Sequence, residues 1–182
     1  MLRAGCCGAA APGNYHGRMS LPQVCVCYVL RTTADGGEQV LLGRKKTGLG
    51  RGRLVGPGGK LEPGESPVEA IVREVAEEVG LVIDPLSLEL VGELDYPFPH
   101  TPAWSQKSWV FQTRAFTGSP RESDELDPQW IDVDRIPLEQ MWDDAQYWLP
   151  SVLRGETVKA TFSFAADGRT VEESDHPAFA AR

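Results

Sequence analysis

Several features of membrane-bound, secreted and polynucleotide-binding proteins are missing from this 182-residue sequence. No apolar run approaches the roughly 20 residues that a helix needs to cross a bilayer, so we expect no membrane contact. Residues 1–18 lack the hydrophobic core of a secretory signal. We expect residues 1–20 to be a disordered leader, or sequence upstream of a start at Met19. The net charge of −8 argues against a nucleic acid polymer as partner, but leaves a small anionic ligand open.

Cysteine is also scarce, with Cys6, Cys7, Cys25 and Cys27 as the four examples. Neither spacing is that of a zinc site or a redox C-x-x-C pair. Cys25 and Cys27 alternate within the apolar segment VCVCYVL, so they would lie on one face of a strand as small buried side chains. Free cysteines are typical of the cytoplasm, which is the predicted location.

The alternation of apolar and turn-forming residues predicts one mixed α/β domain over residues 21–172, followed by a flexible tail at 173–182. Strands are expected at residues 23–32, 40–46, 86–96, 107–116 and 128–136, with a closing hairpin at 156–171. Ser66 and Pro67 predict the start of a helix that ends before Gly80. A second helical spacing occurs within residues 136–153.

The helix before Gly80 carries a crowded acidic face. At 100° per residue, Glu74, Glu77 and Glu78 lie side by side, next to an aliphatic face that would pack on the core. Like charges at these positions repel each other. Either water screens them as an ordinary solvated face, or they act as hard oxygen ligands for Mg²⁺ or Mn²⁺. Arg73 favours the metal site, because a guanidinium can orient carboxylates by paired hydrogen bonds.

A basic segment precedes this helix. Between residues 44 and 60 the chain has no acidic residue and six basic ones, namely Arg44, Lys45, Lys46, Arg51, Arg53 and Lys60. In an acidic chain, this local excess indicates a strand and loop that face phosphate groups. The alternative is that some of these residues are solvated charges at a strand end.

The spacing of fixed residues around the helix resembles the Nudix box, G-x5-E-x7-R-E-U-x-E-E-x-G-U, where U is a bulky aliphatic residue. The matching positions are Gly59, Glu65, Arg73, Glu74, Val75, Glu77, Glu78, Gly80 and Leu81. The resemblance implies the Nudix fold, a mixed sheet between helices, and Mg²⁺-dependent hydrolysis of a nucleoside diphosphate linked to another group. It implies metal binding by Glu74, Glu77 and Glu78 with the Gly58 carbonyl, steering of the carboxylates by Arg73, and support from Glu65.

The segments LLGRKKTGLGRGR and RESDELDPQWIDVDRIPLEQMWDDAQYWLP are similar to the MutT-type branch of this family, the oxidised-purine nucleoside triphosphatases (8-oxo-dGTP diphosphatases). This likeness implies that Glu125 is a metal ligand or the base that activates water, although it could be a turn carboxylate. It implies that Trp142 stacks on a purine, that Asp144 reads the base edge, and that Tyr96 and Phe98 line the opposite wall. We interpret Trp148 as a core residue. The remaining predicted substrate contacts are Lys45, Val55, Gly58, Gly59 and Lys60.

Three positions depart from this branch. Val55 replaces an asparagine that contacts the base, Cys25 replaces a threonine, and Ala145 replaces the second of two acidic residues. Because an apolar wall discriminates poorly between polar base edges, the preferred base stays open. The sequence therefore predicts a monomer or small homo-oligomer that cleaves modified purine nucleoside triphosphates for nucleotide-pool sanitation. The alternatives are a pyrophosphatase acting on ADP-ribose or dinucleoside polyphosphates, and a nucleotide sensor without catalysis.

Overall fold

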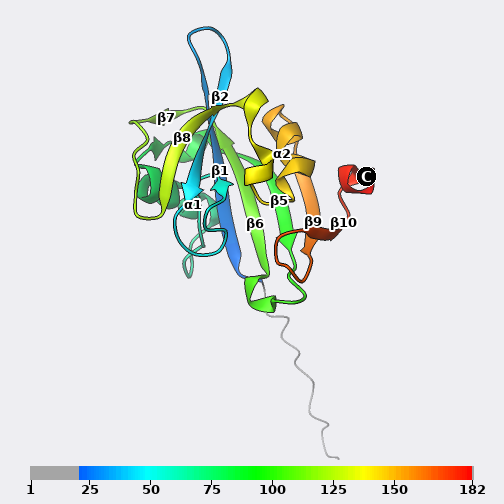
Figure 1. Ribbon diagram of the computed structural model, residues 1–182. Coiled ribbons are helices and arrows are strands. Elements are labelled where there is room, and N and C mark those ends of the chain that lie inside the picture. Colours follow the sequence, from blue (N-terminus) through cyan, green and yellow to red (C-terminus); the bar gives the residue numbers. More distant parts are fainter. Residues whose placement is uncertain (1–20, 182) are drawn as a thin grey trace, which may run out of the picture.

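The computed structural model describes residues 21–181, and a twisted central β-sheet dominates it (Figure 1). The predicted leader, with Cys6 and Cys7, lies outside the described residues. The sheet has eight strands, with neighbours in the order β10-β9-β5-β6-β1-β2-β3, while β8 pairs with β2. The strands are β1 (Gln23–Thr32), β2 (Glu38–Lys45), β3 (Leu54–Val55), β5 (Glu89–Tyr96), β6 (Gln106–Thr113), β8 (Leu126–Asp132), β9 (Val158–Phe164) and β10 (Val171–Ser174).

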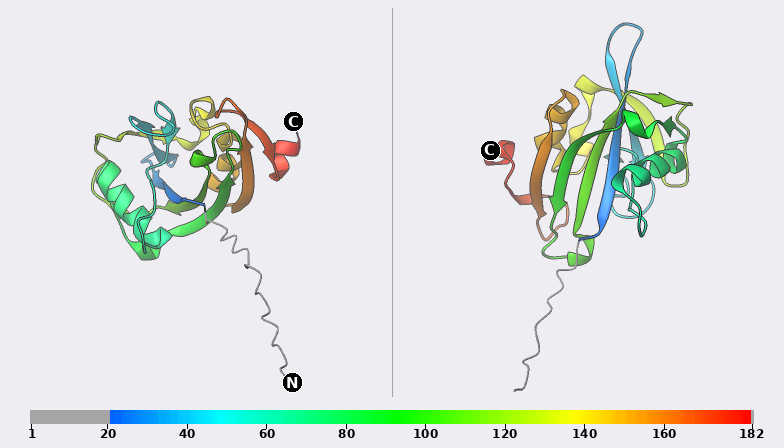
Figure 2. Two further views of the ribbon diagram at one scale, coloured as in Figure 1. Left: turned by 90° about the horizontal axis from the view of Figure 1, so that it is seen from below. Right: turned by 180° about the vertical axis from the view of Figure 1, so that it is seen from behind.

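The sheet is mixed. Strand β1 is parallel to β6 and β5 is parallel to β9, whereas the other pairs are antiparallel. A separate two-stranded sheet joins β4 (Val82–Ile83) to β7 (Phe116–Thr117). Helix α1 (Pro67–Val79) and helix α2 (Ala145–Leu153) cover opposite faces of the central sheet (Figure 2). This arrangement confirms the predicted fold class.

Helix α1 has the ends that its sequence predicts. Ser66 caps its start through a capping box with Glu69, in which Ser66 Oγ accepts the Glu69 N–H and the Glu69 carboxylate accepts the Ser66 N–H. Gly80 ends the helix in the left-handed conformation, with φ of 71°. Its aliphatic face packs into one core cluster with Cys25 and Cys27, so both cysteines point to the same buried side of β1, as predicted.

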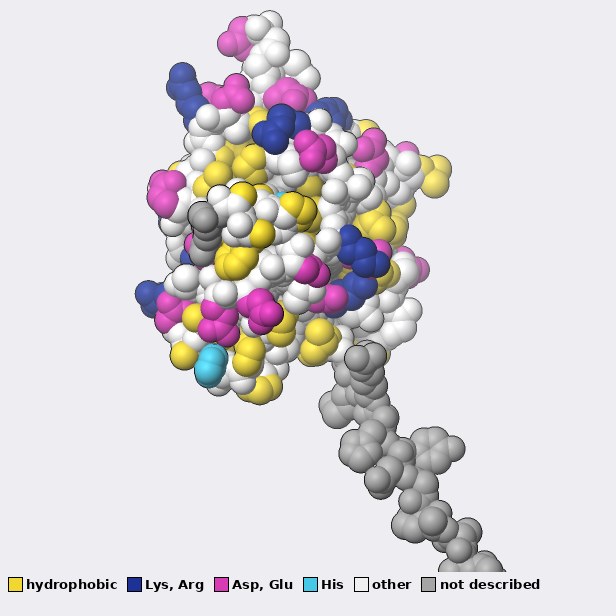
Figure 3. Space-filling model, turned by 90° about the vertical axis from the view of Figure 1, so that its right-hand side faces the viewer, with side chains coloured by type: hydrophobic (Ala, Val, Ile, Leu, Met, Phe, Trp, Pro, Cys, Tyr) yellow, Lys and Arg dark blue, Asp and Glu magenta, His cyan; other side chains and the backbone are white. Residues whose placement is uncertain are grey.

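The second core cluster lies on the other face of the sheet. It joins Tyr28 and Leu30 of β1 to Trp148 and Leu149 of α2 and to Phe162 of β9. Among the described residues, no helix is long and apolar enough to cross a membrane. On the molecular face drawn in Figure 3, basic side chains form small separate groups among acidic ones.

The region predicted to be helical over residues 136–153 is shorter and broken. After a 3-10 turn at Leu138–Gln140, Met141 adopts an extended backbone with ψ of −174°, and α2 begins only at Ala145. The Met141 carbonyl accepts a hydrogen bond of 2.6 Å from Arg53 Nη1 in place of a helical donor. This tertiary contact overrides the helical spacing and directs Trp142 toward a cavity.

The C-terminal residues also differ from the expected tail. The boundary predicted at residue 172 falls inside β10, and the short helix α3 (Pro177–Ala180) follows. His176 Nδ1 accepts the Ala178 N–H at the start of α3, and the Phe179 ring packs edge-on against Tyr147 at 5.3 Å. An apolar anchor near the end of the chain therefore holds this segment against α2.

Candidate active site

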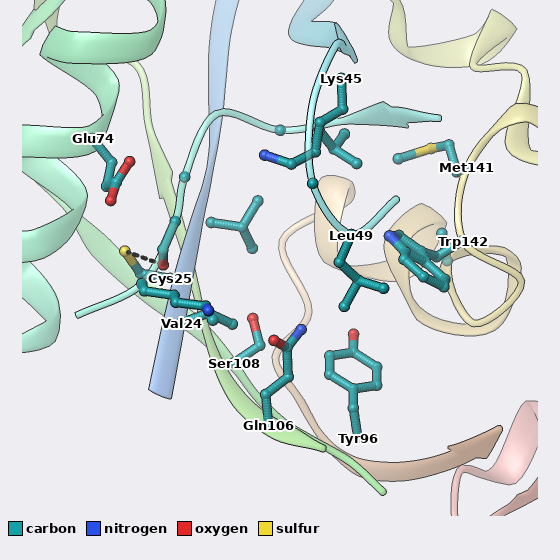
Figure 4. Close-up of a pocket in the computed structure, with 18 of the residues that line it drawn as sticks. Val24, Cys25, Lys45, Leu49, Glu74, Tyr96, Gln106, Ser108, Met141 and Trp142 are labelled. Atoms are coloured by element: carbon teal, nitrogen blue, oxygen red, sulfur yellow. Dashed lines mark hydrogen bonds between the residues drawn. The ribbon is translucent and has the colours of Figure 1, made fainter. Parts of the chain in front are cut away.

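A cavity of about 520 Å³ extends from α1, across β1 and β6, to the start of α2 (Figure 4). Most of the residues predicted for the site line it: Lys45, Val55, Gly58, Gly59, Lys60, Glu74, Glu77, Tyr96, Phe98, Glu125, Trp142 and Asp144. Glu65, Arg73 and Glu78 do not line the cavity. Glu78 contacts Gly58 and Lys45 and Arg73 contacts Glu74, which all line it, whereas Glu65 is linked to the cavity only through Arg73. The cavity thus has an acidic end at α1 and an aromatic end at α2.

Arg73 organises the acidic end. Its guanidinium donates to both oxygens of Glu65, at 2.9 and 2.8 Å, and to Glu74 and Glu77 at 2.9 and 3.2 Å. A further bond of 3.1 Å reaches the Lys60 carbonyl. The paired bonds from Arg73 lower the pKa of Glu65 to about 2. One arginine therefore fixes three carboxylates relative to the loop that precedes the helix.

Glu78 occupies a different position from its neighbours on α1. Its side chain is buried, and Oε2 accepts the Gly58 N–H at 2.8 Å while Lys45 Nζ lies 3.6 Å from Oε1. Oε1 is buried without a hydrogen-bond partner. Burial raises the pKa of Glu78, although the Gly58 N–H and Lys45 oppose the shift. An unsatisfied buried carboxylate oxygen is costly and calls for a positive ligand.

The donor chemistry of the acidic end fits a divalent cation. Burial raises the pKa of Glu74, and the nearby carboxylates of Glu77 and Glu125 raise it further. Within residues 21–181, no group of three or more acidic, histidine or cysteine side chains is placed so that it could hold a metal ion as it stands. The ion pairs with Arg73 and the Gly58 contact of Glu78 hold the carboxylates in separate directions. A bound cation would relieve the crowding of charge and satisfy Glu78 Oε1.

At the aromatic end, Asp144 is buried beside the cavity. Its Oδ2 accepts hydrogen bonds from the Tyr96 hydroxyl at 2.8 Å and from Trp148 Nε1 at 2.7 Å. Burial raises the pKa of Asp144, while these two donors lower it. Trp148 is a buried core residue, as predicted, and it also fixes Asp144. Asp144 therefore reaches the cavity with one oxygen already engaged.

The aromatic wall consists of Trp142, Phe98 and their neighbours. The Arg53 guanidinium covers one face of the Trp142 ring, 4.4 Å from its centre. Phe98 stacks on Phe164 at 4.6 Å and meets Trp142 edge-on at 6.3 Å. These contacts hold the aromatic side chains as a firm surface on which a flat ring could stack.

Two polar wall residues were missed in the sequence. Gln106 and Ser108 on β6 point into the cavity beside Tyr96, and neither side chain makes a hydrogen bond within the described residues (Figure 4). The alternation of QKSWVFQT places both on one face of the strand. No local signal shows that this face, rather than the other, meets a cavity.

The three residues that depart from the family branch form an apolar or neutral part of the cavity wall. Val55, Cys25 and Ala145 all line the cavity. Burial raises the pKa of the Cys25 thiol to about 12, so this side chain is a neutral neighbour of Gly59 and not a thiolate ligand. The hydrogen-bonding groups left open at the base end therefore include Gln106 and Ser108.

The helix with its box of fixed residues, set at one end of a nucleotide-sized cavity in a mixed sheet, defines a Nudix domain. Residues 21–152 match the NUDIX domain family, and the chain belongs to it. It is a Nudix hydrolase. Members of this family generally use divalent metal cations and act on small nucleotide substrates.

The relatives with similar sequences agree with this assignment. The chain is 38% identical over 140 residues to an oxidized purine nucleoside triphosphate hydrolase of Danio rerio, covering 74% of this chain and 84% of that protein. It is 38% identical over 127 residues to the Mus musculus enzyme of the same name, covering 70% and 80%. A MutT protein from Bacillus halodurans has a similar crystal structure, with a TM-score of 0.69, 28% identity, and coverage of 85% and 96%.

Proposed function

We propose that this protein is a Mg²⁺-dependent nucleoside triphosphate diphosphatase that cleaves oxidised or otherwise modified purine (d)NTPs to the monophosphate and pyrophosphate. It would act on free nucleotides in the cytoplasm and so sanitise the nucleotide pool. One observation carries the proposal: a single cavity connects the carboxylates of Glu74, Glu77 and Glu125 to an aromatic end beside Asp144. The names of the Danio rerio and Mus musculus relatives support the same substrate class.

At the acidic end, Glu74, Glu77, Glu78, Glu125 and the Gly58 carbonyl would hold Mg²⁺, with Mn²⁺ as a possible substitute. A bound divalent cation supplies charge neutralisation at the diphosphate and a lowered pKa for a bound water. Arg73 orients the carboxylates, and Glu65 supports Arg73. Lys45 and Lys60 line the cavity and would attract the phosphates. Glu125 would accept the proton of the attacking water, or would complete the metal site.

At the aromatic end, Trp142 would stack on the purine. Phe98 meets Trp142 edge-on, so it would extend the same wall in place of the predicted opposite one, and Tyr96 would lie beside the base. Val55, Gly59 and the backbone of the glycine-rich loop would contact the nucleotide where they line the cavity. Asp144 would face the base edge, although the hydroxyl of Tyr96 and the indole of Trp148 already share one of its oxygens. The unengaged amide of Gln106 and hydroxyl of Ser108 would then supply the remaining base contacts.

A substrate panel tests the proposed function. The protein should show its highest kcat/KM with modified purine triphosphates such as 8-oxo-dGTP, and should release pyrophosphate. The panel includes dGTP, dATP, dCTP, ADP-ribose and diadenosine tetraphosphate at equal concentrations. A highest kcat/KM with ADP-ribose or the dinucleotide would replace this proposal by the corresponding pyrophosphatase. Binding without turnover of any panel member would indicate a sensor.

Replacing Gln106 with methionine should reduce discrimination between bases. The side chain keeps its length but loses its hydrogen bonds, so kcat/KM for the best triphosphate should fall about tenfold, with a smaller change for poor substrates. The exposed Gln129 on β8 provides a matched control, because Gln129→Met leaves the cavity intact. The ratio of kcat/KM values across the panel is the readout. An unchanged ratio would remove Gln106 from base recognition.

A further inference from the structure

The six basic residues between Arg44 and Lys60 divide between different surroundings. Lys45 and Lys60 line the active-site cavity, and Lys46 pairs with Glu122 at 2.8 Å. The three arginines, Arg44, Arg51 and Arg53, line a second cavity of about 570 Å³ that shares only Leu49 and Trp142 with the first. The proposed hydrolysis therefore gives these three arginines no direct contact with the substrate.

Segments far apart in the sequence build the second cavity. They are the loop at 49–53, the 3-10 turn with Trp104, the turn with Gln140, and the turn between β9 and β10 that carries Arg169. Arg44 donates to the Gly52 carbonyl at 2.8 Å and to Gln140 Oε1 at 2.7 Å. Arg53 is fixed by the Met141 carbonyl and by the Trp142 ring. Two of the arginines are thus held in place by neutral acceptors.

None of these four arginines, Arg44, Arg51, Arg53 and Arg169, forms an ion pair with a carboxylate in the part of the chain that the structure describes. Burial lowers the pKa of Arg53 and the charge of Arg169 lowers it further, whereas the more distant carboxylates of Asp144, Asp143 and Asp167 oppose the shift without pairing directly with Arg53. An anion bound between Arg53 and Arg169 would relieve the repulsion between them.

The acidic residues of this cavity do not cancel its charge. Only Glu139 and Asp167 line it, against four arginines. Asp167 already accepts three hydrogen bonds within its own turn, from the N–H of Arg169 at 2.8 Å and from the N–H and hydroxyl of Thr170 at 2.9 and 2.7 Å. Its carboxylate therefore shapes the turn that presents Arg169, and an excess of positive charge remains.

Two tryptophans complete the wall, and glycine turns lie directly against them. A Cβ at Gly50, where φ is 83°, would lie 3.0 Å from Trp142 Nε1, and one at Gly168, where φ is 61°, would lie 2.9 Å from the Trp104 ring. Each glycine is followed by an arginine, Arg51 or Arg169. Both turns therefore place an arginine directly after a glycine that packs against a tryptophan ring.

We propose that this second cavity binds an oligophosphate anion, either inorganic pyrophosphate or the phosphate chain of a nucleotide. Arginine forks match phosphate oxygens by paired, charge-assisted hydrogen bonds, and a tryptophan face accepts a base. The site is separate from the acidic end at α1, and its ligand does not depend on which nucleotide is hydrolysed. Its wall includes Trp142, so occupancy should also alter tryptophan fluorescence.

Calorimetric titration of the full-length, EDTA-treated protein tests this site, with inorganic pyrophosphate and dGTP as separate probes. Removing divalent ions prevents turnover and leaves the carboxylates at α1 to repel phosphate. We expect one pyrophosphate per chain. The double variant Arg51→Gln/Arg169→Gln should weaken this binding about tenfold or more, because each lost fork removes charge-assisted bonds. If dGTP binds more tightly than pyrophosphate, and Trp104→Leu abolishes this difference, the ligand is a nucleotide. If the two affinities are equal, the site recognises the phosphate groups alone.

Two control variants test whether pyrophosphate binds in the second cavity or elsewhere. The variant Arg135→Gln/Arg154→Gln removes the same charge from outside the cavity and should bind pyrophosphate within about twofold of wild type. Lys45→Gln, which changes the active-site cavity, should also bind pyrophosphate within about twofold of wild type. Absence of binding, or an equal loss in the Arg135/Arg154 variant, would overturn the site. If Lys45→Gln loses pyrophosphate binding, the anion binds in the active site, and the second site is overturned as well.

Discussion

Replacing Glu78 with glutamine is expected to lower kcat by about 100-fold or more while the protein stays folded. An amide oxygen can still accept the Gly58 N–H, and the apolar face of α1 is unchanged. The substitution removes the negative charge that faces Lys45 and the unsatisfied Oε1 that would bind the cation. Because burial disfavours the ionised carboxylate, a neutral amide should not reduce stability.

Steady-state kinetics over a range of Mg²⁺ concentrations checks this prediction. The concentration that gives half of the maximal rate should rise in Glu78→Gln, and thermal unfolding should remain close to that of wild type. Glu69→Gln is the matched control, because Glu69 lies on the same helix, is exposed, and a glutamine can preserve its capping box. Turnover by Glu78→Gln equal to that of wild type would exclude Glu78 from the metal site.

The sequence predicts helix α1 well because its signals are local. A capping serine, a proline in the first turn, an aliphatic stripe and a C-terminal glycine all lie within about one helix length. The same helix carries the fixed residues of the family motif, so a metal-binding role could be predicted for it before any fold was known. The alternating cysteines of β1 were predicted to be buried for the same reason, since a strand has a period of two.

Other parts of the site depend on contacts that local patterns do not contain. The spacing of residues 136–153 favours one helix, yet a hydrogen bond from Arg53 to the Met141 carbonyl breaks it. Gln106 and Ser108 share a face of β6 by alternation, but only the sheet order shows that this face meets the cavity. The basic segment is likewise divided by folding, since Arg169 joins three of its arginines from more than 100 residues away.

Replacing Gly58 with alanine is expected to have the largest effect on stability. Gly58 has φ of 153°, and a Cβ would lie 2.1 Å from the Cys25 carbonyl oxygen and 2.8 Å from Val26 Cα. The surrounding loop is bound to β1 by bonds from the N–H of Cys25 to the Gly59 carbonyl and from the N–H of Cys27 to the Pro57 carbonyl, at 2.8 and 2.9 Å. The clash is with backbone and cannot be relieved by a side-chain rotation. The free energy of unfolding should therefore fall by about 3 kcal/mol or more.

Gly64→Ala separates the steric clash from the backbone strain. Gly64 lies in the same loop with φ of 86°, but a Cβ there would meet nothing within 4 Å, so its loss should be about 1 kcal/mol. Urea denaturation of both variants measures the difference. Displacement of the loop should also cost Gly58→Ala its catalytic activity, because the Gly58 N–H positions Glu78. If Gly58→Ala were no less stable than Gly64→Ala, the loop could move away from β1 at little cost. The close contact between the loop and β1 would then not be what fixes the acidic end of the cavity.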